Sequence, residues 1–194
     1  MFQGLAPESP FAVTLYTDSY VVRGTVATRQ RRLTDILNQA EHGFIVLTAV
    51  TLDEFGSRTS PIESEYAQVN LGAVLFGVSD EPVEPLPELR MPKVAEQALI
   101  SIPPFRIVGR IHLLPERDLG DALDELTGTF VPVTEATYWS ETVGEPRTSV
   151  RAVAVNHARA QILAPHREVD PWAGLARGGG AATSDQGSGG ADAG

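Results

Sequence analysis

Apolar and polar residues alternate along several short stretches of this chain, which is the pattern of half-buried β-strands. Two such stretches, 13–17 and 20–27, flank a turn at Asp18 and Ser19 and predict a hairpin. Longer apolar runs over 44–52 and 66–78 predict a third and a fourth strand. The first part of the chain is therefore predicted to be a small, strand-rich domain.

The same pattern returns about 86 residues further along, in the same order and with almost constant spacing. The matched segments are 13–27 with 98–112, 44–52 with 130–138, and 66–78 with 149–163. Polar loops, 54–65 and 140–148, separate the last two runs of each copy. In both copies a glycine, Gly24 or Gly109, falls inside the second strand and predicts a bulge or a sharp bend. The chain is therefore interpreted as two copies of one domain.

A short helix is predicted between the second and third strands of each copy. Leu33, Ile36 and Leu37 have the i, i+3, i+4 spacing of one helical face. The second copy repeats this stripe with Leu119, Ala122, Leu123 and Leu126. Such short helices need a sheet to dock on. The predicted fold is mainly β with short helices: a tandem pair of small bent antiparallel sheets or open barrels, related by a pseudo-twofold axis.

The composition divides the chain into four parts. Residues 1–79 and 98–169 are the two repeats, and 80–97 is a proline-rich linker that favours an extended spacer. Residues 170–194 form a tail rich in glycine and serine, with almost nothing to bury, so that we expect it to be disordered.

The charge and the composition of the chain exclude several classes of function. The chain has no cysteine, which excludes disulfides, thiolate nucleophiles and cysteine-ligated metals. No apolar run is long enough to span a membrane, and no signal peptide is recognised. We therefore expect a cytoplasmic protein with no membrane partner. The formal net charge of −10 disfavours nucleic acid as a partner and suits a basic protein.

No motif of a known catalytic or cofactor site occurs. The sequence lacks HExxH, GxSxG, a phosphate-binding loop and a dinucleotide-binding glycine pattern, so we expect no cofactor, no metal and no catalytic residue. The equivalent carboxylates Asp35 and Asp121 are interpreted as exposed helix positions rather than an acid–base pair. The sequence thus favours a non-enzymatic role and leaves catalysis undecided.

The candidate site for a ligand or partner centres on two equivalent asparagines. Asn70 and Asn156 each lie in an apolar strand, where asparagine is disfavoured and needs hydrogen-bond partners if buried. Their amides either brace a neighbouring turn or face a ligand or partner. Trp139 and His157, each present in one copy only, complete this candidate site. Trp139 is otherwise a residue buried between the repeats, and His157 a surface residue.

A basic cluster supplies an alternative site. Arg29, Arg31 and Arg32 are interpreted as a solvated turn, or alternatively as a nucleic-acid surface shared with Arg106 and Arg110.

The repeat resembles a known but uncharacterised family. Each copy has RLTDILN or DLGDALD, then F-x-x-x-T, then VN before a last apolar run. In these motifs it resembles a bacterial domain of unknown function, which implies no activity and no site residues. It is more weakly similar to Sm-like RNA-binding barrels, through the strand glycine, Asn38 and a late strand with a polar turn. It departs from them in its helix, in Asp124 at the place of Asn38, and in its acidic charge.

These observations favour a non-enzymatic binding or assembly module of the bacterial cytoplasm that engages a protein partner, with a homo-oligomer left open. One alternative is an Sm-like nucleic-acid-binding protein. The other is a small-ligand sensor or enzyme with a pocket between the repeats, lined by the equivalent asparagine and aspartate pairs.

Overall fold

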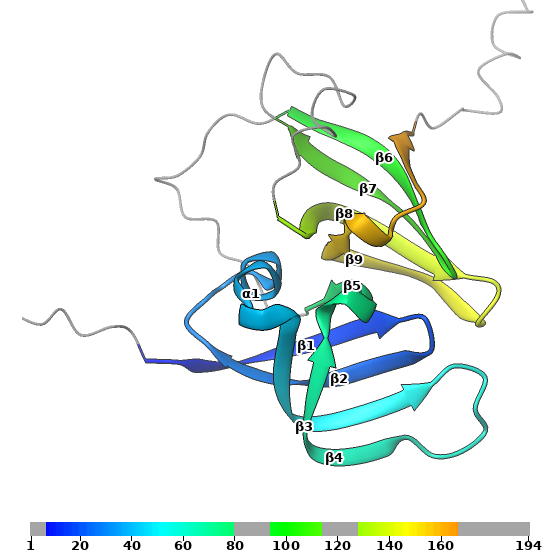
Figure 1. Ribbon diagram of the computed structural model, residues 1–194. Coiled ribbons are helices and arrows are strands. Elements are labelled where there is room, and N and C mark those ends of the chain that lie inside the picture. The colour runs from blue at the N-terminus through cyan, green and yellow to red at the C-terminus, as the bar shows by residue number, and fades with distance from the viewer. Residues whose placement is uncertain (1–6, 80–93, 114–127, 167–194) are drawn as a thin grey trace, which may run out of the picture.

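A computed structural model describes residues 7–79, 94–113 and 128–166, and in this part of the chain it is mainly β with one α-helix (Figure 1). The first half contains β1 (Ser9–Thr17), β2 (Tyr20–Thr28), α1 (Leu33–Gln39), β3 (Phe44–Glu54), β4 (Ile62–Asn70) and β5 (Val74–Val78). The second half contains β6 (Val94–Ile102), β7 (Phe105–Leu113), β8 (Phe130–Ser140), β9 (Glu145–Asn156) and β10 (Ile162–Pro165). The predicted β-rich class is confirmed, and α1 lies where the first leucine stripe predicted it.

Several predicted boundaries fall elsewhere. β6 begins at Val94, inside the segment expected to be a linker. The rest of that segment, the predicted second helix with Asp121 and Asp124, and the tail lie outside the described residues. The single fourth strand predicted over 66–78 is wrong, because a 3-10 turn, Leu71–Ala73, divides it into β4 and β5. The 3-10 turn His157–Arg159 likewise separates β9 from β10, and another, Glu41–Gly43, precedes β3.

The two polar loops are shorter than predicted. The alternation of apolar and polar residues misplaced their ends for a physical reason. β4 starts at Ile62 and carries exposed polar residues, so its outer part looks like a loop in sequence. Conversely, Leu71 inside the 3-10 turn is buried, so the apolar pattern runs through the turn without a break. Between β8 and β9 the expected loop is a tight turn in which Gly144 has a φ of 74°.

All ten strands belong to one antiparallel sheet, in the order β10-β6-β7-β8-β9-β5-β1-β2-β3-β4. The expected pair of separate sheets is therefore wrong. The halves join through β5 and β9, where Phe76 is opposite Val155, Gly77 opposite Ala154 and Val78 opposite Val153. Alternation along a strand tells which side chains share a face, but it does not tell which strand edges pair.

Each half has the same internal strand order, β5-β1-β2-β3-β4 in the first and β10-β6-β7-β8-β9 in the second. β5 and β9 stand at opposite ends of these two series, so the join uses unlike edges. A twofold axis would pair the same strand edge of each half. The expected pseudo-twofold relation is therefore wrong, and the two halves follow each other head to tail. In Figure 1, β3 and β4 lie at the bottom of the molecule, and β6 and β10 lie at the top.

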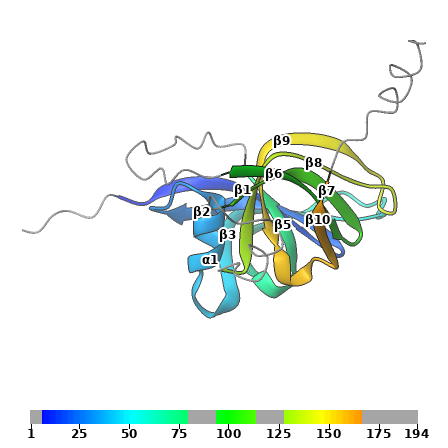
Figure 2. The ribbon, with the colours of Figure 1, turned by 90° about the horizontal axis from the view of Figure 1, so that it is seen from above.

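Both halves contain the same bulge opposite a strand glycine. Ala49 in β3 and Glu135 in β8 have positive φ values of 50° and 49°, and the register with the preceding strand shifts there. A Cβ on Gly109 would lie 2.6 Å from the Val133 Cγ1 atom, and one on Gly24 would lie 3.0 Å from the Leu47 Cβ atom. The strands approach too closely for a side chain, and the sheet bends at both places. From above, its strong curvature is visible, with β9 arching over the side opposite α1 (Figure 2).

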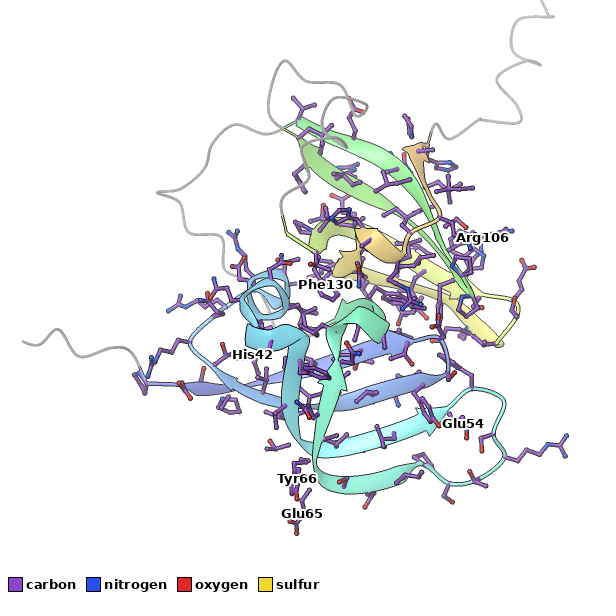
Figure 3. The ribbon with its side chains drawn as sticks, viewed as in Figure 1. His42, Glu54, Glu65, Tyr66, Arg106 and Phe130 are labelled. Atoms are coloured by element: carbon purple, nitrogen blue, oxygen red, sulfur yellow. The ribbon has the colours of Figure 1, made fainter. Side chains whose placement is uncertain are left out.

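The core consists of two apolar clusters, and each half contributes to both. Phe130 and Ala154 of the second half are buried in the cluster of the first half. Tyr16, Val21 and Phe76 of the first half are buried in the cluster of the second. Figure 3 shows Phe130, the first residue of β8, beside α1 of the first half. The join is therefore a shared core as well as a strand pair.

No helix in the described ranges has the length and apolar character needed to cross a membrane.

Candidate functional site

The two asparagines singled out from the sequence meet at one turn beside the join. The Oδ1 atom of Asn70 accepts a hydrogen bond from the Gly72 N–H at 2.9 Å, inside the Leu71–Ala73 turn. From the other half, the Nδ2 group of Asn156 donates to the Val74 carbonyl at 2.9 Å and to the Leu71 carbonyl at 3.3 Å. Asn70 thus caps the turn within its own half, and Asn156 holds the same turn across the join.

The two asparagines differ in exposure although they occupy the same place in their halves. Asn70 is opposite Phe44 at the end of β4, and Asn156 is opposite Phe130 at the end of β9. Asn156 is 1% exposed, whereas Asn70 is exposed. Among the described residues, the Nδ2 group of Asn70 has no hydrogen-bond partner. The Nδ2 group of Asn156 therefore donates hydrogen bonds across the join. The corresponding group of Asn70 makes no such bond among the described residues.

Trp139 does not belong to this arrangement. Trp139 lies near the C-terminal end of β8, whereas Asn156 is opposite Phe130 at the N-terminal end of this strand. At 3.3 Å per residue, the two ends are about 30 Å apart. The ring of Trp139 is half-buried, and the Arg147 guanidinium lies 4.3 Å from the ring centre, in the geometry of a cation–π contact. The sequence-predicted grouping of Trp139 with the two asparagines is therefore not formed.

His157 lies next to Asn156 and makes a local contact. Its Nε2 group is 2.9 Å from the Gly128 carbonyl, and its backbone N–H donates to the Thr129 carbonyl at 3.1 Å. These two bonds tie the 3-10 turn after β9 to the residues that precede β8. His157 thus positions a turn near the join.

Two residues that the sequence analysis left out of the site bridge the halves. Arg159 donates to the Gly72 carbonyl at 2.7 Å and pairs with Asp18 at 2.8 Å, both in the first half. Asn38 of α1 binds both backbone groups of Phe130, at 2.8 Å each. Ala73 stands in the place of Arg159 in the first half, so repetition of sequence gave no signal for it. For Asn38 the only signal was its place in the Sm-like resemblance.

The basic candidates are exposed, and two of them pair with carboxylates. Arg29 is 3.5 Å from Glu8, and Arg110 is 3.1 Å from Glu135. Arg31 and Arg32 are exposed directly before α1, and Arg106 is exposed on β7 (Figure 3). The structure therefore brings the three residues of the arginine cluster together at one loop and leaves Arg106 on another strand.

A cleft of about 450 Å³ opens where the halves meet. Its walls include Thr14, Arg23, Ala49 and Thr148, and the two tyrosines Tyr16 and Tyr138 lie in it. None of Asn70, Asn156 and Asp35 lines this cleft, so its polar lining differs from the asparagine and aspartate pairs expected from the sequence.

Tyr16 and Tyr138 form a hydrogen bond with each other in the buried part of the cleft. The two hydroxyl groups are 2.8 Å apart, and both side chains are 4% exposed. Burial, and then the hydrogen bond to Tyr138, raises the pKa of Tyr16 far above its usual range. Burial also raises the pKa of Tyr138. Both hydroxyls therefore keep their protons at neutral pH and can act only as neutral hydrogen-bonding groups.

Glu145, at the start of β9, is the nearby carboxyl with a shifted pKa. Burial is the main cause that raises its pKa above the ordinary value of 4.5, and the charge of Asp53 raises it further. The charge of Arg23 acts in the opposite direction. The protonated form of this carboxyl is thus more favourable in the folded protein than in the unfolded chain.

Replacing Glu145 with glutamine is expected to raise the Tm at neutral pH, and the gain should vanish in acid. Because the pKa of this carboxyl is raised on folding, its protonated form stabilises the fold below pH 4.5, and this stabilisation is lost as pH rises through the raised pKa. At neutral pH the native carboxyl therefore costs stability that the amide does not. Thermal unfolding of both proteins at neutral pH and below pH 4.5 measures this; an equal gain at both values would contradict the assignment.

No three histidine or acidic side chains gather into a metal-binding group within residues 7–79, 94–113 and 128–166.

The chain matches no protein-family model, and comparison with curated proteins and with solved structures likewise gave no match. The candidate site therefore rests on the geometry of the join and of the sheet edges.

Proposed function

We propose that the protein is a non-enzymatic binding or assembly module of the bacterial cytoplasm, built from two copies of one small domain. It engages a protein partner through the unpaired edges of its sheet. The observation that carries this proposal is the open sheet: among the described residues, β4 and β10 each have a neighbouring strand on one side only. An unpaired strand is a template on which another protein can add a strand.

The idea of two copies is supported by the correspondence of the halves. β6 and β7 follow β1 and β2 by 85 residues, with the same lengths, and β8 follows β3 by 86. The bulges at Ala49 and Glu135, the glycines opposite them and the 3-10 turns Leu71–Ala73 and His157–Arg159 occur at corresponding places. Two unrelated domains would not share all of these irregular features.

The edges carry apolar side chains that fit a protein partner. Phe44 on β3 and Tyr66 on β4 share the outer face of these strands, and are 42% and 70% exposed. Ile162 on β10 is 56% exposed. Figure 3 shows Tyr66 directed away from the rest of the molecule. Large apolar side chains left exposed at a sheet edge are typical of an interaction site.

The proposal is tested by photo-crosslinking of the full chain in its bacterial host. A photoreactive amino acid is placed at Tyr66 on β4 or at Ile162 on β10. The matched control position is Arg106, which is also exposed but lies on β7, a strand with neighbours on both sides. Cross-links to protein from the two edge positions and not from Arg106 are expected. Cross-links to RNA, or no protein cross-link from either edge, would contradict the proposal.

A further inference from the structure

The sheet ends in two edges that are copies of the two edges already joined inside the chain. We propose that the partner is a second copy of this chain, bound head to tail, with β4 of one copy paired to β10 of the next. This inference rests on the proposed function, because it names the protein that the unpaired edges engage.

The first step is topological. Inside the chain β9 pairs with β5. In strand order, β9 has the place in the second half that β4 has in the first, and β5 has the place that β10 has in the second. The two free edges are therefore a β9-type edge and a β5-type edge, which is the combination that the molecule already pairs.

The second step fixes the register. Tyr16 of β1 is opposite Phe76, and Ser101, which follows Tyr16 by 85 residues, is opposite Ile162. Ile162 thus takes the place of Phe76. By the same comparison, Ile45 is opposite Val69 and Val131 is opposite Val155, so that Val69 takes the place of Val155. The contact between copies then places Ile162 opposite Val69, Leu163 opposite Gln68 and Ala164 opposite Ala67.

The third step is burial. At the internal join Phe76 is 0% exposed and Phe130 is 1% exposed. Their counterparts at the free edges, Ile162 and Phe44, are 56% and 42% exposed. Large apolar side chains are thus kept at the positions where the internal join buries them, and a neighbouring copy would remove them from water.

The fourth step is the asparagine pair. Asn156 reaches across the internal join to the carbonyls of Leu71 and Val74. The residues at these places in the second half are His157 and Ala160. The free Nδ2 group of Asn70 would donate to these two carbonyls of the next copy. This gives the exposed asparagine the role that its buried counterpart already has.

Two side-chain contacts of the internal join are not repeated in full between copies. Asp124 has the place of Asn38 in the sequence, and a carboxylate cannot donate to a carbonyl as the Asn38 amide does to Phe130. Arg159 and Asp18 pair across the join at 2.8 Å, but Ala73 and Pro103 occupy the corresponding places. Association between copies is therefore weaker than the internal join. Because the contact is between unlike edges, it propagates into a closed ring or an open chain, according to the rotation from one copy to the next.

The test is the mass of the full chain by sedimentation velocity over a range of concentrations. The native protein is expected to form species above the 20.8 kDa of one chain. Phe44→Lys removes the β4-side contact and Ile162→Lys removes the β10-side contact. Each variant alone should stay monomeric, with association weakened about tenfold or more. A mixture of the two retains one good edge of each kind and should form a heterodimer and nothing larger.

The matched control is Val46→Lys, the same substitution on the same face as Phe44. Its counterpart Pro132 is exposed at the internal join, so this variant should associate like the native chain.

A native chain that stays monomeric at every concentration would overturn the inference, and so would an Ile162→Lys variant that still dimerises. If the native chain is monomeric while the edge positions still cross-link to another protein in the host, only the self-association fails. If those cross-links are absent too, the proposed function fails with it.

Discussion

Truncation of Phe76 to alanine is expected to lower the free energy of unfolding by about 3–5 kcal/mol, the usual cost of removing a buried phenylalanine. Phe76 is fully buried at the join of the halves, and its ring stacks on Tyr16 with centroids 4.4 Å apart. Its ring also contacts those of Phe105 and Tyr138, at 5.1 Å each. One truncation therefore opens a cavity among aromatic side chains of both halves.

Ile162→Ala is the control for this truncation, because Ile162 has the same place on β10 and is 56% exposed. We expect a loss within about 0.5 kcal/mol, as at other exposed surface positions. Urea denaturation of dilute protein measures both variants, so that association between copies does not contribute. Equal losses at the two positions would contradict the burial of β5 at the join.

Replacing Asn156 with alanine is expected to cost about 2 kcal/mol of stability. The amide donates to two carbonyls of the other half in a buried place, and a buried polar group left without its partner costs about 1–3 kcal/mol. Within the described part of the chain, the Oδ1 atom of Asn156 is buried without a hydrogen-bond partner, and its removal offsets part of this loss. The effect therefore falls below the sum for two lost hydrogen bonds.

Asn70→Ala is the matched substitution in the first half. It removes the cap on Gly72, a single exposed hydrogen bond, so that its cost should stay below about 1 kcal/mol. It should weaken the association of copies instead, because the Asn70 amide faces the next copy. Chemical denaturation and sedimentation of the two variants separate these effects. A larger loss of stability for Asn70→Ala than for Asn156→Ala would contradict the assigned roles.

The local structure of the first half was largely predictable from the sequence. Alternation marked β1, β2 and β3, and the stripe of Leu33, Ile36 and Leu37 marked α1, because each of these elements buries one face. The break at Leu71–Ala73 was not predictable, since a buried leucine inside the turn continues the apolar pattern. The pairing of β5 with β9 was not predictable either, because strand pairing depends on backbone edges that side-chain periodicity does not describe.

The asparagines could be singled out because asparagine in an apolar strand requires a compensating hydrogen bond. Their division into one buried and one exposed member follows only from the head-to-tail order of the halves. Arg159 and Asn38 could not be assigned to the join from the sequence, since their partners Asp18 and Phe130 are far away along the chain. Trp139 was grouped with the asparagines as part of the loop after the predicted third strand, but it lies on β8, at the end far from the Phe130 that is opposite Asn156.

Disulfide cross-linking tests the head-to-tail pairing most directly, because the chain has no cysteine of its own. Val78 and Val153 are opposite each other at the internal join, and directly opposed strand residues are close enough for a disulfide. Val78→Cys with Val153→Cys in one chain is the reference pair. The corresponding residues at the free edges, Ala164 and Ala67, are changed to cysteine in two separate chains. On mild oxidation, the mixture of Ala164→Cys and Ala67→Cys is expected to form the mixed disulfide in preference to either homodimer. Cross-links only between like cysteines, while the reference pair closes within its chain, would contradict the head-to-tail account.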